Sequence, residues 1–131
     1  MASILDLPAA DVPNFANACG DSWSEMYNQA REWLGERGLG IYRTYCSAGW
    51  TLEKVAEWFS ADNPGVPVIL MGRSGRKGAT ELDNHAVVLL NGAVAHDPSG
   101  VGLAGPCADS RGQDAWWWLD IIAITSSPRL P

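Results

Sequence analysis

Histidine and cysteine, the residues that most often carry catalysis and metal binding, are scarce in this sequence. Its 131 residues include two histidines and three cysteines. No two cysteines are spaced as CxxC, and no Cys/His cluster has the spacing of a zinc site, so we expect no metal and no cofactor. An odd number of cysteines without a disulfide framework predicts reduced thiols, which are typical of a cytoplasmic protein. Any nucleophile or general base therefore comes from a short set of residues.

Basic residues and long apolar runs are also scarce. Nine Lys and Arg stand against fifteen Asp and Glu, which gives a formal charge of -6. This balance argues against nucleic-acid or anionic-membrane binding driven by net charge. The first residues lack the basic and apolar regions of a secretory signal, and the longest apolar runs, at 66–71 and 115–124, are too short or too interrupted to cross a bilayer. We expect a soluble protein without a nucleic-acid or membrane partner.

The composition that remains is that of a folded domain. Hydrophobic residues make up 47% of the chain and charged residues 18%, which excludes intrinsic disorder. A length of 131 residues corresponds to about one domain. We place this domain at residues 1–124 and interpret residues 125–131 as a C-terminal tail.

Helical patterns lie in the first half of the chain. Apolar residues recur at helical spacing over 23–34 and over 52–59, and each run follows a capping residue, Ser22 or Thr51. Residues 2–7, which precede a proline, are interpreted as the last turns of a further helix.

Strand patterns lie mostly in the second half. The sequence predicts strands at 39–45, 66–71, 85–90, 93–96 and 116–124. The run at 85–90 is almost continuously apolar, which is typical of a strand buried on both faces. Helices followed by antiparallel strands predict an α+β fold.

The segment from His85 to Asp97 carries the clearest chemical signal. An imidazole hydrogen-bonded to a carboxylate is held in one tautomer, as general-base catalysis requires. A two-residue turn at 91–92 would send the two side chains to opposite faces of the hairpin, whereas a three-residue loop over 90–92 with a bulge would set them directly opposite each other. We predict the three-residue loop. The alternative is a buried strand histidine and an aspartate that caps a turn.

The stretch H-A-V-V-L-L-N-G-A-V-A-H-D-P (85–98) resembles the His/Asp half of papain-like cysteine peptidases, especially those that cleave double-glycine leaders from bacteriocin precursors. The segments A-S-I-L-D-L-P-A-A-D-V-P-N-F (2–15) and G-R-S-G-R (72–76) are similar to segments of small papain-like proteins from phage genomes. The resemblance implies a papain-like fold, with N-terminal helices packed on a small antiparallel β-sheet. It also implies His85 as the base and Asp97 as the residue that orients it. If the protein is phage-encoded, its location is the host cytoplasm.

The sequence departs from this family at the nucleophile. In the family the nucleophilic cysteine lies on a helix before a segment like 2–15, and here that segment begins directly after Met1. Three explanations stay open: an inactive protein, a sequence that omits the first helical turns, or another residue that serves as the nucleophile.

Cys19 is the best substitute nucleophile. The stretch N-A-C-G-D-S-W (17–23) echoes the Cys-Gly-Ser-Cys-Trp of papain, with Ser22 at the nucleophile's place. A thiol just ahead of a helix gains from the helix dipole, which lowers its pKa. Alternatively, Ser22 caps the helix and Cys19 is a small apolar residue before it. Cys46 and Cys107 are interpreted as structural or incidental residues in loops.

Two further features point to binding. The Gly-rich loop over 72–78 concentrates basic residues, and Arg73, Ser74 and Arg76 are candidates to hold a carboxylate, a phosphate or an acidic peptide; the alternative is a solvated loop. In the run 116–118, the outer two tryptophans are predicted to face one side of the sheet and Trp117 the other. Trp116 and Trp118 then either pack in the core or form an exposed aromatic patch that binds a partner.

Two functions follow from these expectations. The first is a papain-like cysteine hydrolase or transferase that acts on a peptide or amide bond. The second is a catalytically inactive papain-like module that binds a protein or peptide partner. The first requires a nucleophile beside His85.

Overall fold

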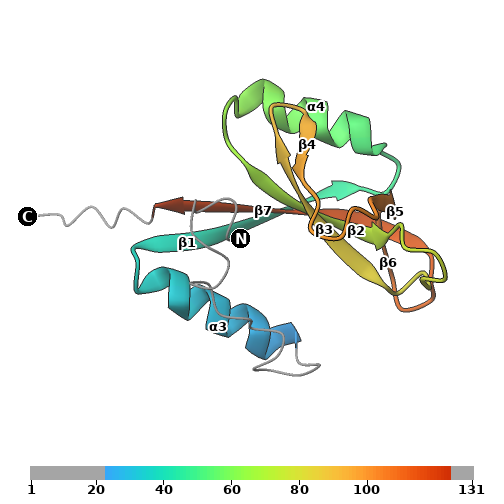
Figure 1. The fold of residues 1–131 in the computed structure, drawn as a ribbon, viewed down its shortest axis with the longest axis horizontal. Coiled ribbons are helices and arrows are strands. Elements are labelled where there is room, and N and C mark those ends of the chain that lie inside the picture. The colour runs from blue at the N-terminus through green and yellow to red at the C-terminus, as the bar shows by residue number, and fades with distance from the viewer. Residues whose placement is uncertain (1–22, 125–131) are drawn as a thin grey trace, which may run out of the picture. The chain divides into compact units, whose positions relative to one another are not determined.

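A computed structural model describes residues 23–124 of the chain (Figure 1). These residues form an α+β fold, as the sequence predicts, because two helices accompany a large antiparallel sheet. The elements in chain order are α3 (Trp23–Gly35), β1 (Leu39–Ser47), α4 (Leu52–Asp62), β2 (Val68–Ser74), β3 (Asn84–Leu90), β4 (Ala93–His96), β5 (Leu103–Gly105), β6 (Cys107–Ala108) and β7 (Asp114–Ile124). The predicted helical turns at 2–7, the residues Cys19 and Ser22, and the tail at 125–131 lie outside the described residues.

The chain divides into two compact units. Of the described residues, 43–121 form one unit, and 23–42 together with 122–124 belong to the other. In the latter, α3 ends at Gly35, where the guanidinium of Arg37 covers the ring of Trp33 at 3.7 Å and donates to the Trp33 carbonyl. The expectation of one domain over 1–124 stays a prediction.

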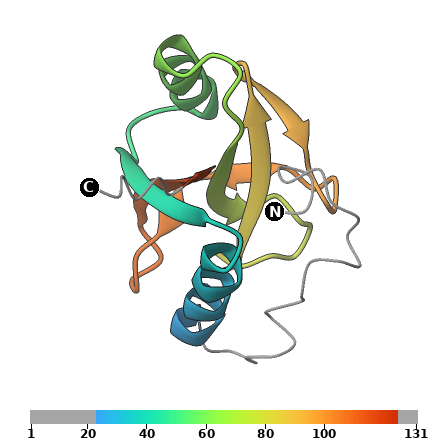
Figure 2. The same cartoon turned by 90° about the vertical axis from the view of Figure 1, so that its left-hand side faces the viewer.

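The unit of residues 43–121 is built on the sheet, whose strand order is β1-β7-β2-β3-β4. Figure 2 shows β3 and β4, in yellow and orange, side by side. Strand β2 is central, with β7 and β3 antiparallel on its two sides. The short strands β5 and β6 pair with β2 and β7. Cys46 lies in β1 and Cys107 in β6, so the prediction that both lie in loops is wrong. Both strands pair with β7, and the apolar pattern around each cysteine is too short to reveal this pairing.

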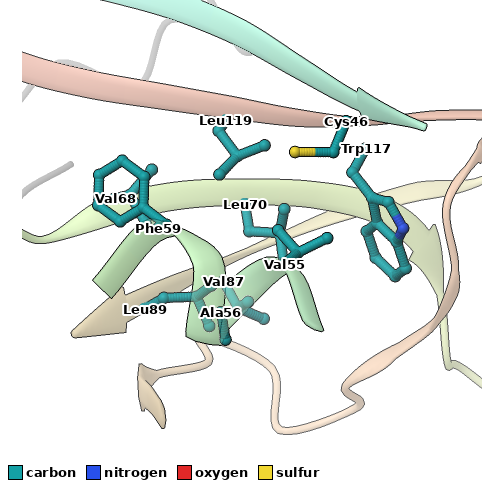
Figure 3. Close-up of a cluster of buried hydrophobic side chains, with 10 residues drawn as sticks. All are labelled: Cys46, Val55, Ala56, Phe59, Val68, Leu70, Val87, Leu89, Trp117 and Leu119. Carbon is teal, nitrogen blue, oxygen red and sulfur yellow. The ribbon is translucent and has the colours of Figure 1, made fainter. Parts of the chain in front are cut away.

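Helix α4 covers one face of this sheet and closes the hydrophobic core (Figure 3). Thr51 caps the helix by accepting a hydrogen bond from the Lys54 amide at 3.1 Å, as its sequence pattern predicts. The core contains buried side chains from α4 and from strands β1, β2, β3 and β7, namely Cys46, Val55, Ala56, Phe59, Val68, Leu70, Val87, Leu89, Trp117 and Leu119. We call this side of the sheet the core face.

The tryptophan run on β7 alternates between the two faces, as predicted. Trp117 is 2% exposed and belongs to the core, while Trp116 and Trp118 stack on each other with ring centroids 6.3 Å apart. On β3, three consecutive residues, Val87–Leu89, are buried, which confirms a strand covered on both faces there.

The turn between β3 and β4 differs from the predicted three-residue loop. Leu90 pairs with Ala93, so Asn91 and Gly92 alone form the turn, with φ of 50° and 84°. Both residues adopt the left-handed conformation that an Asn-Gly pair supplies at low cost, and this turn matches the natural twist of the two strands. The three-residue loop is therefore wrong. A bulge does occur, but within β4.

Core packing leads to a first prediction. Leu70 is fully buried between α4 and the sheet, so Leu70→Ala should lower the free energy of unfolding by about 2–5 kcal/mol through lost burial and the cavity that remains. Urea denaturation followed by circular dichroism measures this value. Leu82→Ala, at a side chain 60% exposed, is the matched control and should change stability by no more than about 0.5 kcal/mol. Equal losses in both variants would contradict the described core.

Candidate functional site: the His85–Asp97 pair

The bulge in β4 decides which side chains of the hairpin share a face. With the two-residue turn alone, His85 and Asp97 would point to opposite faces. Leu89 pairs with Val94, but Val88 pairs with His96, so Ala95 is an extra residue in β4. This insertion shifts the register by one residue and brings Asp97 to the face of His85. The structure thus achieves with a bulge inside the strand what we expected of the turn.

The two predicted residues are in direct contact. The distance from His85 Nε2 to Asp97 Oδ1 is 2.6 Å, a short, charge-assisted hydrogen bond. The side chains are 16% and 15% exposed, so water has only limited access to the bond. His85 lies on the core face, because it pairs with Gly72 and shares its side of β3 with Val87 and Leu89.

Asp97 is held by the loop that follows it. Its Oδ1 accepts a hydrogen bond from the Gly100 amide at 3.1 Å and its Oδ2 one from the Gly102 amide at 2.8 Å. The hydrogen bond from His85, followed by those from Gly102 and Gly100, lowers the pKa of Asp97 against the opposing effect of desolvation. The carboxylate is therefore ionised at neutral pH and is fixed in position from both oxygens.

The hydrogen-bond pattern assigns a role to each nitrogen of His85. An ionised carboxylate only accepts hydrogen bonds, so Nε2 carries the proton and Nδ1 is the acceptor in the neutral ring. A nucleophile that uses His85 as its base must approach Nδ1. Ser99 Oγ lies 3.4 Å from Nε2, next to the nitrogen that already donates to Asp97. The Ser99 hydroxyl therefore lies beside the nitrogen that faces Asp97, and it is not placed to give its proton to Nδ1.

Two of the three cysteines are unsuited to nucleophilic attack. Burial raises the pKa of the Cys46 thiol and raises that of Cys107 to about 11. The Cys107 thiol donates to the carbonyl of Met71 at 3.5 Å. Both residues are thus protonated and buried at neutral pH, in agreement with their interpretation as structural residues.

Gly72 and Trp117 form a wall beside His85 that the sequence analysis missed. Gly72 pairs directly with His85, and a Cβ at Gly72 would clash with the carbonyl oxygen of Gly105 and lie 2.8 Å from Cζ3 of Trp117. The indole therefore packs closely against the glycine on the core face. Its Nε1 donates to the Trp50 carbonyl at 2.9 Å, which fixes the ring. A glycine inside an apolar strand signals such a close approach, but Gly72 was interpreted as the start of a loop.

The three predicted ligand-binding residues do not gather at one point. Arg73 lies in β2 and pairs with Asp114 at 3.2 Å, whereas Arg76 pairs with Asp83 at 3.3 Å. The hydroxyl of Ser74 accepts from the amide of Arg76 at 3.1 Å. Both guanidinium groups thus have carboxylate partners within the chain, and a ligand role for this segment stays a prediction.

Residues 23–124 carry neither a cluster of metal ligands nor a membrane-spanning helix. No cluster of three or more His, Cys, Asp or Glu side chains is placed to hold a metal ion in this part of the chain. None of its helices is long and apolar enough to cross a membrane.

Comparison of this chain with protein-family models, curated proteins and solved structures gave no significant match. The papain-like fold therefore stays a prediction that depends on the short motifs around His85 and Asp97.

The close approach at Gly72 generates a second prediction. Gly72→Ala should lower the free energy of unfolding by about 1–3 kcal/mol, because the new methyl group displaces the Trp117 ring and the Gly105 backbone. Gly49→Ala is the matched control, since its Cβ would meet only Ser47 Oγ at an ordinary 3.7 Å. Urea denaturation of both variants measures the difference. A Gly72 variant as stable as the Gly49 variant would rule out the indole wall.

The lowered pKa of Asp97 generates a third prediction. A carboxyl group whose pKa is lower in the folded state stabilises the fold above its unfolded pKa, and this stabilisation is lost as pH falls through the folded pKa. The wild type should therefore exceed Asp97→Asn in stability at neutral pH, and the gap should close below about pH 4. Urea denaturation across this pH range measures the gap. A gap that is constant with pH would contradict the lowered pKa of Asp97.

Proposed function

We propose that this chain is a papain-like cysteine hydrolase or transferase domain that acts on a peptide or amide bond. The observation that supports this most directly is the 2.6 Å hydrogen bond from His85 Nε2 to Asp97 Oδ1. It holds the imidazole in the tautomer that leaves Nδ1 free to take a proton from a thiol. In this proposal His85 is the general base and Asp97 the positioning residue.

The reaction proceeds by acyl transfer. His85 Nδ1 takes the proton of the nucleophilic thiol, and the thiolate adds to the carbonyl carbon of the substrate. The carbon–nitrogen bond then breaks, and the imidazolium returns the proton to the departing amine, which leaves a thioester. Water attacks the thioester in a hydrolase, whereas a second amine attacks it in a transferase. Either route regenerates the thiol.

Cys19 is the proposed nucleophile. Cys46 and Cys107 are buried thiols with raised pKa values, which makes both poor nucleophiles. Cys19 precedes α3, where the helix dipole favours a thiolate. It lies outside the described residues, so this assignment depends on the sequence pattern and on the chemistry of the other two cysteines.

The second candidate function is an inactive papain-like module that binds a protein or peptide. One observation favours it: Ser99, the residue whose hydroxyl contacts His85 in the described part of the chain, lies at Nε2 and not at Nδ1. In this case the His85–Asp97 bond serves only to hold the hairpin to the loop that follows it.

We also infer a cytoplasmic location, which is the host cytoplasm if the protein is phage-encoded. The described cysteines, Cys46 and Cys107, are free thiols, which is typical of a reducing compartment. The formal charge of -6 is unfavourable for a nucleic-acid partner. A peptide or protein is therefore the proposed substrate or partner.

Thiol labelling distinguishes the two functions. The native full-length chain is treated with iodoacetamide at mildly acidic pH, and mass spectrometry follows the rate at each cysteine. An enzyme should label at Cys19 about tenfold or more faster than a free thiol, because a lowered pKa supplies thiolate at this pH. Cys46 and Cys107 serve as internal references and should label slowly, since both are buried.

Variants of the two histidines complete this test. His85→Ala should abolish the fast labelling at Cys19, whereas His96→Ala, at an exposed histidine of the same hairpin, should leave it unchanged. If Cys19 labels no faster than a free thiol, or if His85→Ala has no effect on its rate, the enzyme proposal fails and the inactive module is supported.

A further inference from the structure

The face of the sheet opposite the core carries an exposed group of aromatic side chains. Tyr45 from β1 and Trp116 and Trp118 from β7 line a hollow of about 330 Å³, which we call the aromatic groove. Tyr45 is 57% exposed and Trp116 is 37% exposed. Exposed aromatic side chains gathered around a hollow are typical of interaction surfaces. All three residues belong to the unit of residues 43–121.

The aromatic groove already binds one cation of the chain itself. The guanidinium of Arg43 lies over the Trp118 ring, 4.5 Å from its centroid. Asp120 holds this guanidinium through two hydrogen bonds, of 2.7 and 2.9 Å. Trp118 also stacks nearly parallel to Trp116, and the edge of Tyr45 meets Trp118 at 5.9 Å. The π-faces of this stack attract positive charge.

The charges around the aromatic groove are paired and leave it open to a cationic partner. Both nearby arginines are neutralised within the chain, Arg43 by Asp120 and Arg73 by Asp114, so neither repels an incoming cation. The Asp114 side chain is half-exposed. The chain as a whole carries a formal charge of -6, which attracts basic partners and disfavours a second copy of the same chain.

A neutral sugar fits these observations less well. Sugar recognition combines an aromatic face with several hydrogen-bonding groups that fix the hydroxyls. Among the described lining residues, the Tyr45 hydroxyl is an available polar group, but Trp118 Nε1 is buried within the wall.

We propose that the aromatic groove docks a basic segment of a partner protein, with an arginine or lysine head group stacked on the exposed part of Trp116. The partner's cation would stack on Trp116 as the guanidinium of Arg43 stacks on the neighbouring Trp118. The site does not depend on the proposed enzymatic function, since Trp116 and Trp118 lie on the opposite face of the sheet from His85 and the core.

Fluorescence anisotropy with labelled peptides tests this proposal on the full-length chain. The probe is a short fluorescein-labelled peptide of alternating arginine and glycine. Its control carries citrulline in place of arginine, which keeps the shape of the side chain and removes the charge. The arginine peptide should bind, and the citrulline peptide should bind about tenfold or more weakly, because the cation–π attraction is lost.

Matched tryptophan variants locate the binding site. Trp116→Leu should weaken binding of the arginine peptide about tenfold or more, as for a central aromatic anchor. Trp58→Leu, at a tryptophan of α4 that is 42% exposed, should leave the affinity unchanged. If circular dichroism shows that Trp116→Leu does not fold, the comparison of Tyr45→Ala with Tyr45→Phe takes its place, and only the alanine variant should lose affinity.

Several outcomes would overturn the proposal. Equal affinity for the arginine and citrulline peptides would show a groove that selects shape and not charge. Equal effects of the Trp116 and Trp58 variants would place the peptide elsewhere. Absence of peptide binding, together with a concentration-dependent dimer in sedimentation that Trp116→Leu abolishes, would make a second copy the occupant.

Discussion

The register of the β3–β4 hairpin is the constraint on which the His85–Asp97 pair depends. A strand alternates its side chains between two faces, so a shift of one residue reverses every side chain beyond it. The extra residue Ala95 makes this shift and brings the Asp97 carboxylate to the imidazole of His85. The amides of Gly100 and Gly102 then hold the carboxylate. The turn and the bulge set the face on which Asp97 lies, and the following loop fixes its position.

The same alternation gives the two faces of β7 different properties. Trp117 faces the core, where its ring packs over Gly72 and its Nε1 bonds to the Trp50 carbonyl. Its neighbours Trp116 and Trp118 face the other way and line the aromatic groove. A single strand thus supplies both the wall beside His85 and a separate, exposed aromatic surface. The chemistry proposed for one face is therefore independent of binding at the other.

Most elements could be predicted because their signals are local. Helical spacing and the Thr51 cap indicate α4, and Asn91-Gly92 indicates that a hairpin joins β3 and β4. The bulge at Ala95 could not be predicted, because an exposed alanine carries no local signal and its position follows from contacts that Asp97 makes beyond the strand. The predicted three-residue loop is wrong, although the contact between His85 and Asp97 that it was meant to explain is present. The tight packing at Gly72 was missed because its partner, Trp117, lies far away in the sequence.

The sequence by itself determined the α+β class and the alternation of the tryptophans, and it marked His85 and Asp97 as candidate partners, because periodicity and turn chemistry act between near neighbours. Only the tertiary structure decided that Nε2 of His85 bonds to Asp97, that Cys46 and Cys107 are buried, and that Arg73 and Arg76 pair with separate carboxylates. The reason is physical. Strand register, burial and ion pairing depend on which distant residues meet when the sheet assembles, and no local stretch of sequence specifies those contacts.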